Sequence, residues 1–307
     1  MTDLPGLGPE GTLRLACRPP FDWTALVGFL GPRATPGIEW ARDTLYRRTF
    51  RAAGQAGVLE VRHEEDQGCI EVVFHLGGDS QTGEMRDEVA ARLRRLFDVD
   101  TDPAPIAERL SEDPFLRPAV AARPGLRVPG AWDGFELAVR AILGQQVSVA
   151  AATTLAGRLV RTHGEVLPAP VGWGPPGDLR FFPRPEVLAA SDLRELGLPG
   201  ARAAAISSLA AAVAADSTLI APEQDAGMAT RRLTTLPGIG PWTAQYIAMR
   251  WFRDADAFPA SDLGLRRSAA GKSPEMPTPA ALAKRAEAWQ PYRAYAAMHL
   301  WAALAST

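Results

Sequence analysis

A Pro-Gly-x-Gly-Pro turn between two helical stretches restricts the fold of this chain more than any other feature. Residues 226–235 have helical spacing, Pro237-Gly238-Ile239-Gly240 forms the turn, and a second helix is expected to begin at Pro241. Proline is favoured at the first position of a helix, because the amide N–H there has no partner. Glycine has no Cβ and lets the backbone come close to a ligand. The turn therefore predicts free N–H groups at the positive end of a helix, where they can bind a phosphate but cannot read a base sequence. A packing corner without a ligand explains the turn alone equally well.

The pattern of apolar residues changes near residue 101. Before it, apolar residues alternate over 58–62 and 70–76, which indicates strands, and helices are expected over 22–30 and 84–97. After it, the helical stretches are 134–144, 147–163, 200–215, 226–235, 241–252 and 279–304. We therefore predict an α+β domain with an antiparallel sheet over 1–100 and an all-α region over 101–307. Within that region one lobe is expected over 134–254, and a second from 101–133 together with 255–307.

Composition excludes several classes of protein. The chain has 307 residues, a net charge of −2 and two cysteines, Cys17 and Cys69. Two cysteines cannot supply four ligands to an iron–sulfur cluster, and no His/Cys spacing suits zinc. Residues 201–307 hold 11 basic and 8 acidic residues, so the mild positive charge lies toward the C-terminus. No apolar run is as long as a membrane span, and we expect a soluble cytoplasmic protein with no required cofactor.

Several segments carry a resemblance to a known family. The hairpin Leu236-Pro237-Gly238-Ile239-Gly240-Pro241-Trp242-Thr243-Ala244 is similar to that of the helix–hairpin–helix DNA glycosylases. Asp262, in the segment Ala257-Phe258-Pro259-Ala260-Ser261-Asp262-Leu263-Gly264-Leu265, stands where that family has its catalytic aspartate. Segments 18–23, 140–150 and 291–301 resemble motifs of the bacterial DNA-3-methyladenine glycosylase II branch, which acts on alkylated bases. The likeness covers roughly residues 13–304 and implies that the all-α region is a two-lobed glycosylase body.

The resemblance implies that Asp262 is catalytic. A glycosylase extrudes its target base from the duplex, and positive charge develops on the sugar as the base leaves. A carboxylate at ~4 Å, with an effective dielectric of ~20, stabilises that charge by about 4 kcal/mol, or roughly a thousandfold in rate. Aspartate is also a favoured helix N-cap, so a purely structural role for Asp262 is the alternative.

The residue after the hairpin bears on the reaction type. In the branch that attacks the sugar with a lysine and cleaves the strand, the lysine stands where this chain has Trp242. The two lysines of the chain, Lys272 and Lys284, lie downstream and do not match. We therefore expect a monofunctional enzyme that uses water.

Aromatic residues predict how the base is held. Trp242 and Tyr246 are four residues apart and share a helix face, and by resemblance Phe29 and Trp301 line the same pocket. An electron-rich ring attracts a cationic base by about 0.5–2 kcal/mol. Core packing is the alternative for each ring. Ala302 stands where well-known relatives have a tyrosine.

The remaining expectations concern DNA. Gln146 stands where close relatives have a leucine that fills the gap left by the extruded base, and a solvated loop glutamine is the alternative. By resemblance, Pro237, Gly238, Ile239 and Gly240 grip the DNA backbone, and the carbonyls of Thr234, Leu236 and Ile239 hold a monovalent cation. The expected partner of a monomeric chain is duplex DNA with alkylated bases. Two alternatives are a glycosylase for oxidised or deaminated bases and a non-catalytic module that only binds duplex DNA.

Overall fold

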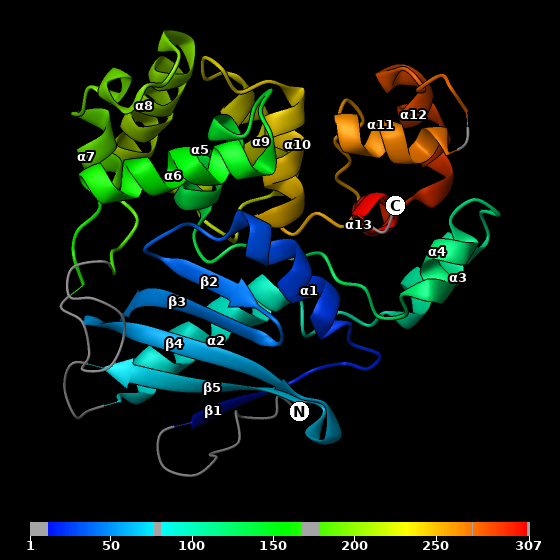
Figure 1. Ribbon diagram of the computed structural model, residues 1–307, viewed down its shortest axis with the longest axis horizontal. Coiled ribbons are helices and arrows are strands. Elements are labelled where there is room, and N and C mark those ends of the chain that lie inside the picture. Colours follow the sequence, from blue (N-terminus) through cyan, green and yellow to red (C-terminus); the bar gives the residue numbers. More distant parts are fainter. Residues whose placement is uncertain (1–11, 77–80, 168–178, 272, 306–307) are drawn as a thin grey trace.

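The computed structural model describes residues 12–76, 81–167, 179–271 and 273–305. Lys272 falls in one of the gaps. The N-terminal part is built on a five-stranded sheet in the order β1-β5-β4-β3-β2, with every neighbouring pair antiparallel (Figure 1). The strands are β1 (Thr12–Ala16), β2 (Glu39–Arg42), β3 (Leu45–Ala52), β4 (Gln55–Glu64) and β5 (Cys69–Leu76).

Two helices complete this α+β domain. Helix α2 (Gly83–Phe97) lies across one face of the sheet and buries Met85, Val89 and Leu93 against it (Figure 1). Helix α1 (Trp23–Leu30) starts after Asp22, whose Oδ1 accepts from the Ala25 N–H at 2.9 Å, and a 3-10 turn, η1 (Gly31–Arg33), follows. The predicted helices and the antiparallel sheet are confirmed.

The rest of the chain is helical. Its longer α-helices are α5 (Gly134–Leu143), α6 (Val149–His163), α8 (Gly200–Ala215), α9 (Ala226–Thr234), α10 (Pro241–Arg250), α11 (Leu263–Ala270), α12 (Pro279–Ala286) and α13 (Arg293–Ala305). The shorter ones are α3 (Ala104–Ser111), α4 (Arg117–Ala122) and α7 (Pro185–Ala189). The 3-10 turns outside η1 are η2 (Glu65–Gln67), η3 (Leu193–Leu196), η4 (Ser217–Ile220) and η5 (Glu287–Trp289).

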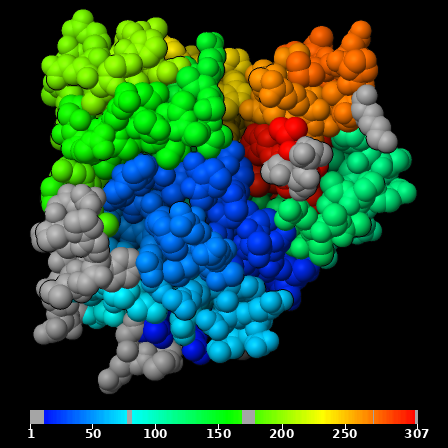
Figure 2. Space-filling view, in the orientation of Figure 1, coloured from blue at the N-terminus to red at the C-terminus, as the bar shows by residue number. Residues whose placement is uncertain are grey.

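These helices form two lobes, each with a hydrophobic core. One core joins α5, α6, α8, α9 and α10, and the other joins α3, α4, α11, α12 and α13. In Figure 2 the yellow residues of α9 and α10 are visible between the green helices and the orange helices. The predicted class, an α+β domain followed by a two-lobed helical body, is confirmed.

The prediction of one helix over 279–304 is wrong. The segment divides into α12, the turn η5 and α13, and Pro291 lies between the last two. Proline has no N–H to donate to a preceding turn and its ring clashes with the carbonyl four residues back, so the helix cannot continue through it. Helix α13 restarts at Arg293 and carries Trp301 on its last turns. Among the described helices, none is long and apolar enough to cross a membrane.

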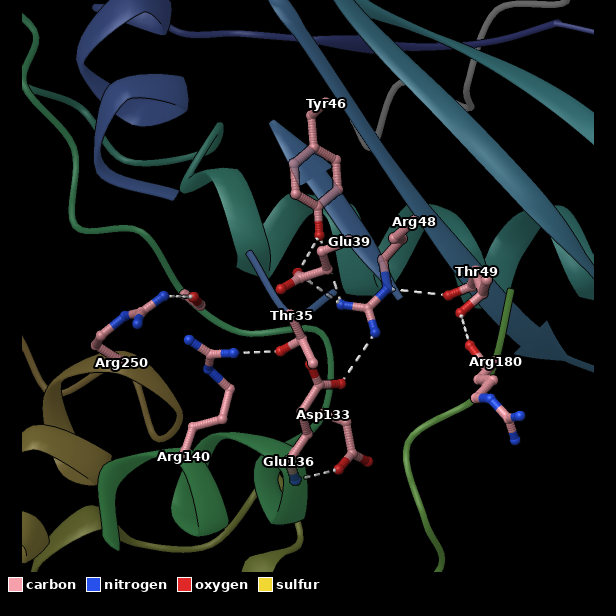
Figure 3. Close-up of polar contacts among 11 residues, drawn as sticks. Thr35, Glu39, Tyr46, Arg48, Thr49, Asp133, Glu136, Arg140, Arg180 and Arg250 are labelled. Atoms are coloured by element: carbon pink, nitrogen blue, oxygen red, sulfur yellow. Dashed lines mark hydrogen bonds and ion pairs between the residues drawn. The ribbon is translucent and has the colours of Figure 1, made fainter. Parts of the chain in front are cut away.

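A buried ionic network joins the sheet to the helical body (Figure 3). Arg48 on β3 is 4% exposed, and its Nη2 donates to Glu136 Oε2 on α5 at 3.0 Å. Its Nη1 donates to Glu39 Oε1 on β2 at 3.1 Å, and the Tyr46 hydroxyl donates to the same oxygen at 2.6 Å. This network ties β2 and β3 to α5, and α1 and η1 lie between β1 and β2 in the chain.

Candidate active site

Asp262 stands at the N-terminus of α11 and is held by three donors. Its Oδ1 accepts from the Leu265 N–H at 2.9 Å and from the indole Nε1 of Trp301 at 2.9 Å. Its Oδ2 accepts from the indole Nε1 of Trp242 at 3.0 Å. The side chain is partly exposed. Asp262 therefore caps a helix, as one interpretation of the sequence had it, and also lies at the place where α10, α11 and α13 meet.

The four aromatic residues predicted for the pocket lie together. Trp242 and Tyr246 stack with ring centroids 5.3 Å apart and planes 10° apart. Trp301 lies 6.4 Å from Tyr246 and 6.2 Å from Phe29 by ring centroids. All four are partly exposed. They come from α1, α10 and α13, so each of the three parts of the molecule supplies one wall, and the rings remain accessible to a planar ligand.

The hairpin between α9 and α10 has the predicted form, with Gly240 as the N-cap of α10 and Pro241 at its first position. A Cβ on Gly240 would have nothing within 4 Å, which leaves this backbone open to a ligand. Gly238 differs, because it has φ +80° and an added Cβ would lie 2.4 Å from the Cβ of Ala205 on α8. The turn and the packing against Ala205 therefore require glycine at position 238. The sequence alone had suggested a different reason, the close approach of the backbone to a ligand. Pro237 is exposed and Ile239 is buried in the lobe core.

Comparison with known proteins assigns the chain to a family. Residues 12–133 match the AlkA N-terminal domain, and residues 139–291 match the HhH-GPD superfamily of base excision DNA repair proteins. Over 287 residues the chain is 35% identical to DNA-3-methyladenine glycosylase 2 of Escherichia coli, a match that covers 92% of this chain and 94% of that protein. The chain belongs to the HhH-GPD superfamily.

Two further comparisons extend this assignment. The HhH-GPD chain is 42% identical over 294 residues to a probable bifunctional transcriptional activator/DNA repair enzyme AlkA of Mycobacterium tuberculosis. That match covers 95% of the chain but 57% of the relative, so the chain spans little more than half of its length. The solved 3-methyladenine DNA-glycosylase of Archaeoglobus fulgidus superposes with a TM-score of 0.80 at 22% identity, covering 95% and 98% of the two chains. At this identity the likeness shows a common fold.

The loop between α5 and α6 of this HhH-GPD protein lies beside the hairpin. The Gln145 amide donates to the Gly238 carbonyl at 2.8 Å and to the Thr243 hydroxyl at 2.9 Å, so it braces the loop against the hairpin and α10. The next residue, Gln146, is exposed and has φ +56°, an uncommon conformation for a residue other than glycine. The hydrogen bonds of Gln145 therefore hold the loop that carries the exposed Gln146.

Sequence reasoning missed the cations beside the aromatic rings. The Arg250 Cζ lies 5.0 Å from the centroid of Phe29 and 5.4 Å from that of Tyr246, and Arg33 Cζ lies 3.8 Å from the centroid of Phe29. Arg250 Nη1 donates to the Tyr246 hydroxyl at 2.8 Å. The spacing of Arg250, four residues after Tyr246, was available as a signal. Arg33 likewise follows Phe29 by four residues, but nothing in the sequence places Arg33 near Tyr246 or Arg250.

Proposed function

We propose that this chain is a monofunctional DNA glycosylase that extrudes alkylated bases from duplex DNA and removes them by hydrolysis, leaving an abasic site. The observation that carries the proposal is the position of Asp262, a partly exposed carboxylate hydrogen-bonded to two indoles of a partly exposed aromatic cluster. The 35% identity to DNA-3-methyladenine glycosylase 2 of Escherichia coli, over 94% of the length of that protein, also supports the proposal.

The geometry supports the following steps. The extruded base stacks among Trp242, Tyr246, Trp301 and Phe29, and a base that carries positive charge gains from the electron-rich faces of these rings. The glycosidic bond breaks, the bonding electrons stay with the base, and positive charge develops on the sugar. The Asp262 carboxylate stabilises that charge more than it stabilises the substrate, which is the requirement for faster chemistry. A water molecule then adds to the sugar and gives its proton to Asp262 or to solvent.

The elements next to this cluster suit duplex DNA. Among the described residues, no side chain caps the N-terminus of α10 at Gly240, so its first backbone N–H groups can bind a phosphate two residues from Trp242. Pro237 and Gly238 lie exposed on the same turn. Gln146 takes the space of the extruded base, where its amide stacks and hydrogen-bonds to the orphaned partner. One chain supplies all of these groups, so we propose that a monomer acts on one lesion.

The hairpin also suits a monovalent cation held by carbonyl oxygens of Thr234, Leu236 and Ile239. Thr234 ends α9, where carbonyls lack helical partners and carry partial negative charge. Among the described residues, no N–H donates to the carbonyls of Thr234 or Ile239, and the Leu236 carbonyl accepts from the Ile239 N–H at 3.2 Å. A carbonyl has two lone pairs, so this bond leaves Leu236 able to act as a ligand. The cation would neutralise part of a nearby phosphate charge.

The choice of water as nucleophile rests on the residue at 242. Trp242 stands beside Asp262 where a lysine would be needed for attack on the sugar. Lys284, on α12, is an exposed surface residue that pairs with Glu287 at 3.2 Å. Neither residue offers an amine to the aromatic cluster.

The deciding experiment measures released bases. The protein is incubated with a duplex that contains one N7-methylguanine or N3-methyladenine, free bases are identified by mass spectrometry, and the DNA is analysed with and without alkali. We expect the methylated base in solution and a strand that breaks only after alkali. Binding without release would support a non-catalytic duplex-binding module, and strand breakage without alkali would support a lyase.

A further inference from the structure

The aromatic cluster has charges of opposite sign against different rings. The Asp262 carboxylate accepts hydrogen bonds from the indole N–H groups of Trp242 and Trp301. The guanidinium of Arg33 covers Phe29 at 3.8 Å, and that of Arg250 lies within 5.4 Å of both Phe29 and Tyr246. A base that stacks among the four rings therefore lies between a carboxylate and two guanidiniums.

Both guanidiniums donate hydrogen bonds to backbone carbonyls. Arg250 is 5% exposed and donates to the carbonyls of Pro129 and Gly130, while Arg33 donates to the carbonyl of Phe29. Of the described carboxylates, none forms an ion pair with Arg33 or Arg250. Arg33 and Arg250 line a small cavity of about 30 Å³ together with Glu39 and Glu136. Both of these glutamates form hydrogen bonds with Arg48 instead (Figure 3).

The Tyr246 hydroxyl connects the two guanidiniums to the rings. It accepts from Arg250 Nη1 at 2.8 Å, and the positive charge of Arg33 also acts on it. Burial alone would raise the pKa of Tyr246, but the positive charges of Arg250, Arg33 and Arg140 lower the pKa below its ordinary value. In the part of the chain that the structure describes, no atom accepts the hydroxyl proton. The O–H can therefore donate to an acceptor on a bound base.

We propose that Arg33, Arg250 and the Tyr246 hydroxyl form the leaving-group end of the pocket and determine which bases leave fastest. This inference rests on the proposed function. When the glycosidic bond breaks, its electron pair stays on the base nitrogen, and a neutral base gains negative charge while a cationic base becomes neutral. The guanidiniums stabilise the first outcome and repel the cationic ground state of the second. The hydroxyl donates to the base edge, and the proton of the attacking water goes to Asp262 or to solvent.

The magnitude follows from Coulomb's law. A unit charge at about 6 Å in an effective dielectric of ~20 changes a rate or a binding constant by roughly 100-fold. Partial charge in the transition state reduces this effect, so removing one guanidinium should change the ratio of neutral to cationic excision by about 10-fold. The same variant should bind the cationic lesion more tightly.

The test compares the variants Arg33→Gln and Tyr246→Phe with the control Arg62→Gln. The control also replaces an arginine by glutamine, but Arg62 lies on β4 and pairs with Glu60, away from the rings. Single-turnover kcat/KM is measured on duplexes that contain N7-methylguanine, which is cationic, or hypoxanthine, which is neutral. Thermal melting reports folding. Tyr246→Phe keeps the ring and removes only the hydroxyl, so it remains informative if Arg33→Gln does not fold.

The expected result is a fall of about 10-fold in the hypoxanthine-to-methylguanine ratio for both site variants, with no change for Arg62→Gln. Parallel loss on both substrates would mean that Arg33 and Tyr246 only support the fold and would overturn the inference. Release of methylguanine without any release of hypoxanthine by the unmodified protein would also overturn it. Release of neither base would instead refute the proposed function.

Discussion

Replacing Asp262 by asparagine removes one charge from the proposed site and keeps the shape of the side chain. The Oδ1 position accepts from two N–H groups, of Leu265 and Trp301, so the amide oxygen should occupy it. The amide nitrogen then faces the indole N–H of Trp242, 3.0 Å from the Oδ2 position, with donor against donor. Asp262→Asn therefore has a cost for stability as well as a cost for catalysis.

The two costs are separable. Loss of a charge ~4 Å from the developing cation removes about 4 kcal/mol of transition-state stabilisation, or roughly a thousandfold in rate. The indole N–H of Trp242 without an acceptor costs about 1–3 kcal/mol of folding free energy. Asparagine still caps α11 through its oxygen, so the helix should persist. We expect a folded protein with a lower melting temperature and almost no excision.

The assay pairs single-turnover release of N7-methylguanine with fluorescence anisotropy on a duplex that contains a stable abasic analogue. Asp225→Asn is the matched control, because Asp225 caps α9 with Oδ1 2.7 Å from the Met228 N–H and has no indole donor. The control should release base at the normal rate. The reasoning fails if Asp262→Asn excises within about 10-fold of the unmodified protein, since the Coulomb term predicts far more. It also fails if the variant loses duplex binding to the same extent as excision.

Three further predictions, with four substitutions among them, test the fold around the site. Gly238→Ala should destabilise the protein by about 2–4 kcal/mol, because its Cβ would meet Ala205 at 2.4 Å in a backbone with φ +80°, whereas Gly240→Ala should leave the urea unfolding midpoint unchanged. Burial lowers the pKa of His299 to about 4, so the unfolded chain binds a proton at a higher pH than the folded chain does. The free energy of unfolding therefore falls as the pH decreases from 6.5 to 4, by up to about 1.4 kcal/mol per pH unit. In urea titrations, the loss of stability between pH 7 and pH 5 should be smaller for His299→Gln than for the unmodified protein. Arg48→Met leaves Glu136 buried without its cation and should cost about 3–5 kcal/mol, measured by the same titration at pH 7.

Local signals explain how much of the fold could be predicted from the sequence. Asp22 caps α1, Pro241 opens α10 and the alternation over 70–76 forms β5, and each of these depends on residues close in sequence. The split at Pro291 was equally local, but the strong helical pattern on both sides of it hid the break. The presence of an element was thus easier to predict than its ends.

The site could be predicted only where a motif carried it. Asp262 is the clearest example, because the sequence allowed two roles for it, a helix cap and a catalytic carboxylate. In the structure Oδ1 caps α11 while Oδ2 is bonded to Trp242, so capping leaves the second oxygen toward the rings. Arg33 was missed because its nearness to Tyr246 depends on how the sheet docks against the helical body. No periodicity within a segment reports a contact of that kind.

The docking of the sheet gives the N-terminal domain a place in the site itself. Phe29 of α1 is 6.2 Å from Trp301 of α13 by ring centroids, and the Arg33 Cζ lies 3.8 Å from the centroid of Phe29. The Arg48–Glu136 pair holds the domain against α5, and Arg140 of α5 donates to Thr35 just after η1 (Figure 3). A break in this buried contact would move one aromatic wall and one guanidinium together, without touching Asp262. A change at the interface between the domains should therefore alter the selectivity among bases more than it alters the chemistry at Asp262. The reason is that selectivity depends on Phe29 and Arg33 of the N-terminal domain, whereas Asp262 belongs to the helical body.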